Sequence, residues 1–551
     1  MGLLEVIRHN NVPKVILRYI MMNFLDLDSI EKIILNVKEM NVLDNYSKNF
    51  LVQVCKGFEQ NCQDGRLDVV KWLARHENID VHANDEFYFR LACCKGHYDI
   101  AKWLYSNFSI NIHANSEDAF GLACANGHLN MAKWLVKISQ LGCLKPQYGM
   151  FASAPSQFDG DIETNAFISS TNEIKTLHSL GNINIHVEHE YAFRCSCEYD
   201  YLDMAKWLHS LGNINIHVDN EYAFRSSCKN DNINMAKWLH SLGNINIHID
   251  NEYAFRVSCA NDNINMAKWL HSLGNINIHA NNEYAFRFSC KNGNINMAKW
   301  LHSLGNINIH AKDECAFKWA CEYGNINMAK WLHSLGNINI HDDNDYAFEW
   351  SCRNGHIEIS QWLHSLGNIN IHSINYAFRL SCENGHINLA KWLHSRCKIN
   401  IHAKKELSFV LACQNNHLDV AQWLHSIDKN IAIRACTKRV FKLVCAAGNL
   451  SVAKWLYSID GIAAYVNIKK AFRISCKNGC LDVAKWVHSI NKNINVNTKN
   501  EKAFRSACTN NHLDVAKWLH SIAHINIHVN NDCLFNSAKN EIKTWLKSID
   551  K

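Results

Sequence analysis

Proline is almost absent from this chain, at 3 of 551 residues, and no apolar run reaches the 18 residues that a membrane span needs. The N-terminus has no basic and then apolar leader, so a secretory signal is not expected either. Charge is sparse as well: 20% of residues are charged and the net charge is +6, without the clustered basic charge that is typical of nucleic-acid binding. We expect an intracellular protein that contacts neither membranes nor nucleic acids.

The motifs of catalysis and metal binding are missing too. The chain has no glycine-rich phosphate loop, no nucleophile elbow, and no Cys-x-x-Cys or His-Glu-x-x-His motif. Most of its 32 histidines recur in fixed places about 31 residues apart. Equivalent histidines are then too far apart to share a zinc ion, whose ligands lie about 2.0–2.1 Å from the metal. The sequence therefore predicts no enzyme activity, no metal site and no cofactor.

Cysteine is abundant, with 23 residues, but most of these hold one fixed place in a repeat, as Cys197, Cys228 and Cys259 do. Stacked helical units lie about 10 Å apart, whereas a disulfide needs α-carbons about 4.4–6.8 Å apart. Cross-linking along this series would distort the units. We expect small, buried, reduced side chains, which fits a reducing compartment.

A tryptophan that returns every 31 residues is the strongest signal in the sequence, as at Trp207, Trp238 and Trp269. A period of this length predicts one supersecondary unit that is stacked many times. Fourteen clear units follow, and two degenerate ones end near residues 178 and 546. We expect about 16 units, whose tryptophans are buried between neighbouring units.

Residues 222–249 illustrate the unit. Residues 223–228 place Ala223, Phe224 and Cys228 on one face of a short first helix. Residues 233–242 form a second helix with a broad apolar stripe, and Gly243 supplies the positive φ of its C-terminus. Residues 244–248 alternate apolar and polar side chains, which predicts an extended arm to the next unit. The fold class is therefore an all-α solenoid of helix-turn-helix units.

This unit resembles the ankyrin repeat. Residues 127–135 (GHLNMAKWL) and 512–519 (HLDVAKWL) match the second-helix half of that family, whereas Tyr-Ala-Phe-Arg replaces its usual Thr-Pro-Leu-His box. The phrases Phe-Arg-x-Ser-Cys and Ile-Asn-Ile-His-Ala are most similar to those of ankyrin-repeat proteins from mimivirus-type giant viruses. The resemblance covers about residues 55–551. It implies a non-enzymatic protein-binding scaffold that acts in the host cytoplasm.

Residues 1–54 lie outside the pattern and are predicted to form a helical N-terminal cap. The segment 12–40 also resembles the start of an F-box, which would make the chain a substrate adaptor of a ubiquitin ligase. The residues that would then contact a Skp-type adaptor protein are Pro13, Ile16, Leu17, Ile20 and Leu25. The acidic residue that usually follows the proline of this motif is absent, and both interpretations stay open.

Two further stretches depart from the period. Residues 143–185 hold a degenerate repeat with an inserted loop that contains Pro146 and Pro155; either this repeat has decayed, or residues 143–165 act as a joint. Residues 531–551 form a degenerate capping repeat. Regular repeats are therefore predicted over residues 55–142 and 186–530.

Candidate binding residues are those that vary while their neighbours do not. One place in the first helix, which faces away from the Phe and Cys stripe, carries large aromatic residues only near the centre of the array. Beside it the loop turns acidic, and the usual Glu-Arg pair with i to i+4 spacing, as in Glu221 and Arg225, becomes Asp345 and Glu349. The candidate protein-binding surface consists of Phe288, Trp319, Asp342, Asp343, Asp345, Glu349 and Trp350.

Aromatic anchors beside uncompensated charge are typical of interface hot spots. The alternative for Trp319 and Trp350 is that they only fill a gap against the neighbouring arm. The near-identical units over residues 178–341 also allow an array that expanded by duplication and has no specific partner. We expect unidentified protein partners, host proteins among them.

Overall fold

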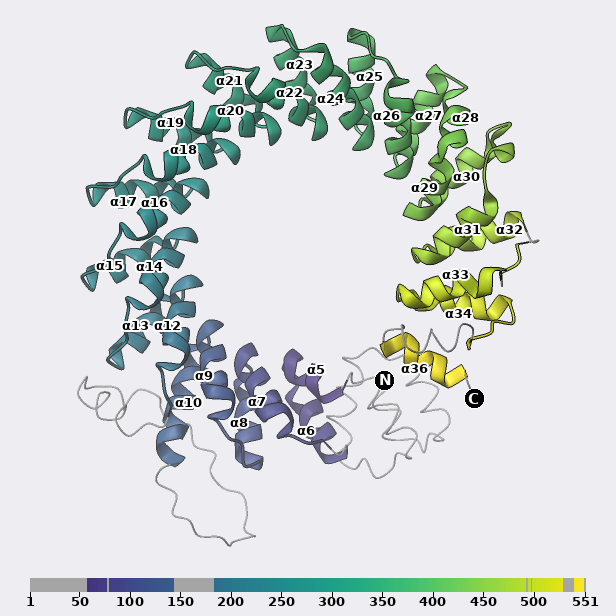
Figure 1. Cartoon of the computed structure of the whole chain (residues 1–551). Helices are drawn as coiled ribbons and strands as arrows, with labels where there is room; N and C mark the ends of the chain where they lie inside the picture. The colour runs from purple at the N-terminus through teal and green to yellow at the C-terminus, as the bar shows by residue number, and fades with distance from the viewer. Residues whose placement is uncertain are drawn as a thin grey trace, which may run out of the picture. The chain divides into compact units, whose positions relative to one another are not determined.

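The computed structural model of the chain describes residues 57–76, 79–142, 183–491, 494–496, 498–528 and 540–549. It divides into two units, residues 1–280 and 281–551. In both, paired helices stack one after another, with the first helices in one layer and the second helices in the other (Figure 1). The all-α repeat fold predicted from the sequence is confirmed.

The first unit contains six described helix pairs. Its helices are α5 (Gly57–Asp64), α6 (Leu67–His76), α7 (Ala83–Lys95), α8 (Tyr98–Asn107), α9 (Ala114–Ala125), α10 (Leu129–Gly142), α12 (Val187–Glu198), α13 (Leu202–Ser210), α14 (Val218–Lys229), α15 (Ile233–Ser241), α16 (Ile249–Ala260) and α17 (Ile264–Ser272).

The second unit has eight described pairs, the additional short helix α28 before the pair of α29 and α30, and a last helix. These are α18 (Ala280–Lys291), α19 (Ile295–Ser303), α20 (Ala311–Glu322), α21 (Ile326–Ser334), α22 (Asp342–Arg353), α23 (Ile357–Leu366), α24 (Ile371–Glu383), α25 (Ile387–Arg396), α26 (Ala403–Gln414), α27 (Leu418–Ile427), α28 (Ile431–Lys438), α29 (Val440–Ala447), α30 (Leu450–Ser458), the 3-10 turn η2 (Ile462–Ala464), α31 (Ile468–Lys477), α32 (Leu481–Ile490), α33 (Thr498–Thr509), α34 (Leu513–Ile522) and α36 (Asn540–Ile549).

The core of each repeat comes from the apolar stripes that the sequence predicts. In α14, Ala223, Phe224 and Cys228 are at most 1% exposed, and Met235 and Leu239 of α15 are fully buried. Full burial of a side chain of this size stabilises the fold by about 1.5–3 kcal/mol. Burial also raises the pKa of the Cys228 thiol well above its ordinary value, so the cysteine series acts as inert apolar filling.

Hydrogen bonds join neighbouring repeats across their buried side. The hydroxyl of Ser227 donates to the carbonyl oxygen of Cys197 in the preceding repeat, at 3.1 Å. The side-chain amide of Asn232, at the start of α15, donates to the carbonyl oxygen of Glu198 at 2.9 Å. In other repeats a histidine takes the place of Asn232: the Nε2 atom of His386 lies 2.9 Å from the carbonyl oxygen of Arg353. Side chains of each repeat therefore satisfy backbone carbonyl groups at the end of the preceding first helix.

The tryptophans link the repeats, as predicted, but they are not the centre of the core. Trp238 is only partly buried. It contacts Phe193 of the preceding repeat, with 6.2 Å between ring centroids. In most of the described repeats the fully buried aromatic is instead the phenylalanine of the first helix. The expectation that the tryptophans are buried between neighbouring repeats is met only in part, because the indole of Trp238 in the second-helix layer stays partly exposed.

The first helices begin with a turn that the sequence did not predict. In α14, Asp219, Asn220 and Glu221 have φ of 51°, 58° and 58°, and most first helices from α7 to α26 show the same three consecutive positive φ values. We call these three residues the left-handed turn of a repeat. Only after this turn does the right-handed helix of the apolar stripe begin.

Candidate functional site

The left-handed turn sets the place of its last residue, an acidic side chain that points back into the repeat. Glu221 is 5% exposed. Its carboxylate lies 2.9 Å from the Nδ1 atom of His217 and accepts a hydrogen bond from the backbone N–H of Asn246 in the next arm, at 3.3 Å. The predicted ion pair between Glu221 and Arg225 is wrong: Arg225 instead donates to Asp250 of the next repeat, at 2.8 Å.

These contacts explain the histidines of the arms. In the repeats with the left-handed turn, the histidine lies four residues before the buried acid, so its imidazole meets that carboxylate across the turn, as His310 meets Glu314 at 2.8 Å. Within the described ranges, no group of three or more His, Cys, Asp or Glu side chains could hold a metal ion. The arm histidines are therefore part of the structure of the repeat.

Phe288, Trp319 and Trp350 occupy the same place in α18, α20 and α22, and all three are partly exposed. The rings of Phe288 and Trp319 meet edge to face, with centroids 5.1 Å apart. Tyr284 stacks on Phe288, with ring centroids 4.0 Å apart. This part of the predicted surface is a continuous aromatic patch that spans two repeats.

A lysine that the sequence analysis missed lies over this patch. The Nζ atom of Lys291 is 5.4 Å from the ring centroid of Phe288, 5.3 Å from that of Trp319 and 4.9 Å from that of Tyr323. Tyr323 is 48% exposed. Lys291 follows Phe288 by three residues, and Tyr323 follows Trp319 by four. Residues at these spacings share one face of a helix, and this spacing is the sequence signal that could have identified them.

Trp350 has neighbours of its own in α22. It stacks on Tyr346, with ring centroids 5.2 Å apart, and the guanidinium of Arg353 lies 4.3 Å from its ring centroid. One repeat further, Tyr376 is 39% exposed and lies 4.4 Å from the guanidinium of Arg379. The aromatic surface therefore carries cations along its length.

The four predicted carboxylates have different surroundings. Asp342 forms an ion pair with Lys318 at 2.8 Å, so its charge is compensated within the array. Asp345 is 3% exposed and lies 2.6 Å from His341, while its second oxygen accepts from the backbone N–H of Asn370 at 2.9 Å. It holds the arm, as Glu221 does in its own repeat.

Asp343 and Glu349 are the carboxylates of this set that make no ion pair within 4.0 Å among the described residues. Asp343 is exposed and Glu349 partly exposed. Burial, together with the charges of Asp345 and Asp343, raises the pKa of Glu349 to about 7, against the opposing hydrogen bond from Ser373 and the charge of Arg379. Glu349 therefore keeps a proton more readily than an ordinary glutamate does.

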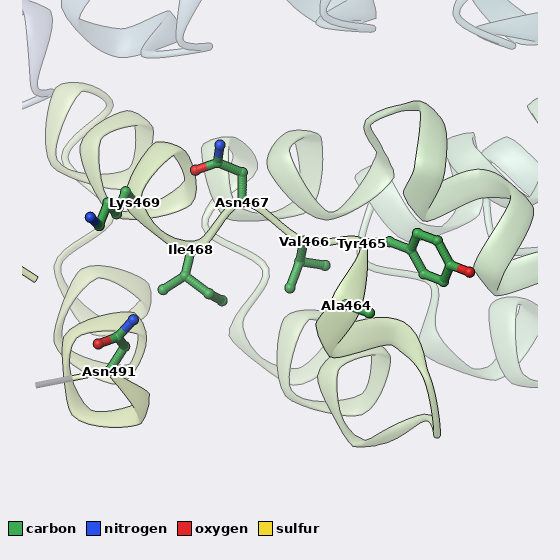
Figure 2. Close-up of a pocket in the computed structure, with 7 residues that line it drawn as sticks. All are labelled: Ala464, Tyr465, Val466, Asn467, Ile468, Lys469 and Asn491. Atoms are coloured by element: carbon green, nitrogen blue, oxygen red, sulfur yellow. The ribbon is translucent and has the colours of Figure 1, made fainter. Parts of the chain in front are cut away.

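A shallow hollow of about 460 Å³ lies between η2 and the start of α31, and Figure 2 shows the seven residues that line it. Its side chains are Ala464, Tyr465, Val466, Asn467, Ile468, Lys469 and Asn491. Asn467 is engaged in capping α31, because its side chain accepts from the backbone N–H of Lys470. This lining does not bring together an acid, a base and a nucleophile.

The F-box-like segment and its candidate adaptor contacts, Pro13, Ile16, Leu17, Ile20 and Leu25, lie outside the described residues, and they stay a prediction of the sequence. The same is true of most of the degenerate repeat at 143–185. In the part of the chain that the structure describes, no helix is long and apolar enough to cross a membrane.

Comparison with known proteins agrees with the helix pairs. The family model for ankyrin repeats in three copies matches residues 58–147, 255–344 and 286–375. No curated protein matches the chain. The matched segments include α18, α20 and α22, which carry the candidate surface. The stacked helix pairs and this family match show that the chain contains ankyrin repeats over the matched residues.

Proposed function

We propose that this chain is a protein–protein interaction scaffold whose partner docks on the first helices α18, α20 and α22. The observation that supports it most is the row of Phe288, Trp319 and Trp350. These large rings are partly exposed at a place that holds smaller residues elsewhere, such as Ser226 and Val257. Tryptophan is among the residues that most often dominate binding energy at interfaces.

Ankyrin repeats support a scaffold that is not an enzyme. Each repeat contacts mainly its neighbours, so side chains on the face of the first helices can vary without disturbing the buried stripes. The candidate residues show this separation: Phe317 and Phe348 are fully buried beside the partly exposed Trp319 and Trp350. A partner that binds the variable row would therefore not contact the buried residues that stabilise the fold.

The experiment is affinity capture with the full chain and with the variant Trp319→Ala/Trp350→Ala. The control is Val257→Ala, at the equivalent place in α16. Loss of the captured partner with unchanged helical circular dichroism supports the proposal. Loss of helicity together with binding would show that both indoles serve packing. If the full chain captures no protein, the array has no specific partner.

We also propose that this is a viral protein that acts on host proteins. The proposal rests on the short sequence phrases that resemble those of ankyrin-repeat proteins from mimivirus-type giant viruses. Amoebal lysate is accordingly the first source for the capture experiment. Capture from other eukaryotic lysates with equal efficiency would count against this setting while leaving the scaffold proposal intact.

A further inference from the structure

An arginine one residue after the buried phenylalanine secures the left-handed turn in several repeats. In α16, Arg256 donates from Nε to the carbonyl oxygen of Asn251 at 2.6 Å and from Nη2 to that of Asp250 at 2.8 Å. The same two kinds of contact recur at Arg90, Arg194 and Arg287, and Arg225 makes the second of them. We call this place, between the turn and the following arm, the guanidinium site.

The following repeat supplies an acidic side chain to the same guanidinium. Arg194 pairs with Asp219 at 3.1 Å and Arg225 pairs with Asp250 at 2.8 Å. The repeats of α9, α20 and α26 have Gly121, Lys318 and Val410 at the place of this arginine. In α20 the ammonium of Lys318 pairs with Asp342 of the next repeat. At α26 a guanidinium arrives from the next repeat, where Arg434 contacts both Glu406 and Asp428. In most of the described repeats with this turn, a guanidinium or the ammonium of Lys318 therefore accompanies it.

In α22 the guanidinium site has the opposite charge. Its left-handed turn is Asp343, Asn344 and Asp345, and the residue after the buried Phe348 is Glu349. Among the described repeats with this turn, it alone has an acid at that place. A carboxylate cannot donate to the turn carbonyls; instead Ser373, from the next repeat, donates to the carbonyl oxygen of Asn344 at 3.1 Å.

The site itself therefore presents acceptors and negative charges, while the guanidinium of Arg353 lies over the ring of the adjacent Trp350. Glu349 and Asp343 are accessible, while Asp345 already meets His341 and the next arm. The nearby cation, Arg379, makes no ion pair within 4.0 Å in the part of the chain that the structure describes, and it lies over Tyr376. A divalent metal is a poor match, because no metal-binding group of side chains occurs in the described ranges.

We propose that the site at Glu349 receives an arginine side chain from a basic segment of the partner protein, next to Trp350 on the same helix. A guanidinium has the donors that this site holds elsewhere in the chain, and its planar fork can bind a carboxylate through two hydrogen bonds. The aromatic rings beside it supply the apolar part of the contact. This inference rests on the proposed function and specifies the chemistry of the partner.

The test uses the full chain and labelled hexa-arginine, hexa-lysine and hexa-glutamate peptides, with fluorescence anisotropy at low salt. Glu349→Arg restores the arginine that other repeats carry, so the variant fills its own guanidinium site. Glu358→Arg is the matched control, because it makes the same charge change at an exposed position of α23 in the same repeat. Glu349→Gln removes the charge with almost no change in shape.

We expect hexa-arginine to bind more tightly than hexa-lysine and hexa-glutamate not to bind. Glu349→Arg should weaken hexa-arginine binding about tenfold, since an interfacial charge pair is lost and a like charge is introduced. Glu349→Gln should weaken it less, and Glu358→Arg by less than about twofold, because exposed charges contribute little. Hydrogen exchange of α22 confirms that each variant is folded.

Equal weakening by Glu349→Arg and Glu358→Arg would reduce the effect to net charge and overturn the inference, as would the absence of hexa-arginine binding. The proposed function fails in a different way. If capture of a partner depends on Trp319 and Trp350 but is unchanged by Glu349→Arg, the scaffold proposal is supported and the arginine contact is contradicted. If neither change affects capture, both proposals are contradicted.

Discussion

Trp238 and His209 of the preceding repeat meet edge to face, with ring centroids 5.8 Å apart and the planes at 85°. The same pair recurs along the array, for example between His302 and Trp331. The periodic Trp-Leu-His phrase is thus a contact between repeats, in which each helix supplies an indole to one neighbour and an imidazole to the other. Because this contact lies at the partly exposed layer, it contributes less to stability than the buried phenylalanine does.

The first prediction compares these two aromatics. Phe224→Ala should lower the local free energy of unfolding by about 3–5 kcal/mol, as expected for a fully buried aromatic, because Phe224 is 0% exposed. Trp238→Ala should cost less, since the indole is only partly buried. Hydrogen-exchange mass spectrometry of α14 and α15 measures both, because an array of this length need not unfold in one step. A larger loss for Trp238→Ala would contradict the burial order.

The buried acid of each left-handed turn provides the second prediction. Glu221→Ala removes the acceptor of the backbone N–H of Asn246 and the partner of His217. An unsatisfied buried group costs about 1–3 kcal/mol, so exchange in the arm at 244–248 should accelerate accordingly. Arg225→Ala should cost less, because its partner Asp250 is exposed and surface pairs contribute about 0–1 kcal/mol.

Glu221→Gln is the control, because its amide oxygen can still accept from Asn246. It should recover most of the stability that Glu221→Ala loses. If Arg225→Ala were the more damaging of the two alanine changes, the ion pair suggested by the sequence would describe the protein better than the observed contacts do.

The helices could be predicted from the sequence because their signal is local and repeated. The spacing of Ala223, Phe224 and Cys228 fits one face of a helix, and the structure buries all three. Gly243 has the positive φ that was expected at the end of the second helix, 97°. Such features depend only on neighbours within one turn, and the period repeats them many times.

The left-handed turn could not be predicted by the same reasoning. Asp219, Asn220 and Glu221 look like the first turn of an ordinary helix, where acidic residues are favoured. Consecutive left-handed residues other than glycine are costly, about 1–2 kcal/mol each, so propensity argues against them. The only available signal was the recurrence of Asp and Asn at the first two places, since these residues tolerate positive φ best.

The candidate surface was predicted only in part, for a related reason. Variation identified Trp319 and Trp350, which the structure leaves partly exposed. It could not separate Asp345, which holds the next arm, from Asp343, which is exposed. The separation depends on the direction of a side chain after the left-handed turn. It also depends on the next arm, 25 residues further along the chain.

The third prediction concerns the histidines that join repeats at the start of second helices. Burial lowers the pKa of His386, with the charges of His417 and His356 acting in the same direction and the carbonyl of Arg353 opposing. The folded state therefore binds fewer protons, so this contribution to stability is present above the ordinary pKa of 6.5 and is lost as the pH falls below it. Acid should weaken the packing of α24 on α22.

The change His386→Asn should remove this acid sensitivity. Asn325 holds the same place two repeats earlier and donates to the carbonyl oxygen of Lys291 at 2.8 Å, so the hydrogen bond between repeats is kept. Melting curves at pH 5 and pH 8 should show a higher melting temperature for the variant than for the parent chain only at the lower pH. Asn325→His is the reciprocal control and should introduce acid sensitivity at its own repeat. Parallel losses in parent and variant would show that other groups cause the acid response.

The fourth prediction uses Glu349, whose pKa is raised to about 7, chiefly by burial. A raised carboxyl pKa means that the folded state holds the proton longer than the unfolded chain does. The stability from this group is therefore complete below its ordinary pKa of 4.5 and is lost as the pH rises through 7. Glu349→Gln cannot ionise, so it should match the parent chain at pH 4 and be more stable at pH 8.

The difference at pH 8 should be about 1 kcal/mol or less, because the side chain is partly exposed and solvent screens its charge. Hydrogen exchange of α22 and α24 at both pH values measures it, and Glu358→Gln, at an exposed place in the same repeat, should show no such pH-dependent gain. Bound hexa-arginine should shrink the difference, since a guanidinium beside Glu349 stabilises the ionised carboxylate that Gln lacks. A gain that is equal at pH 4 and pH 8 would mean that packing, and not the titration of Glu349, separates the two chains.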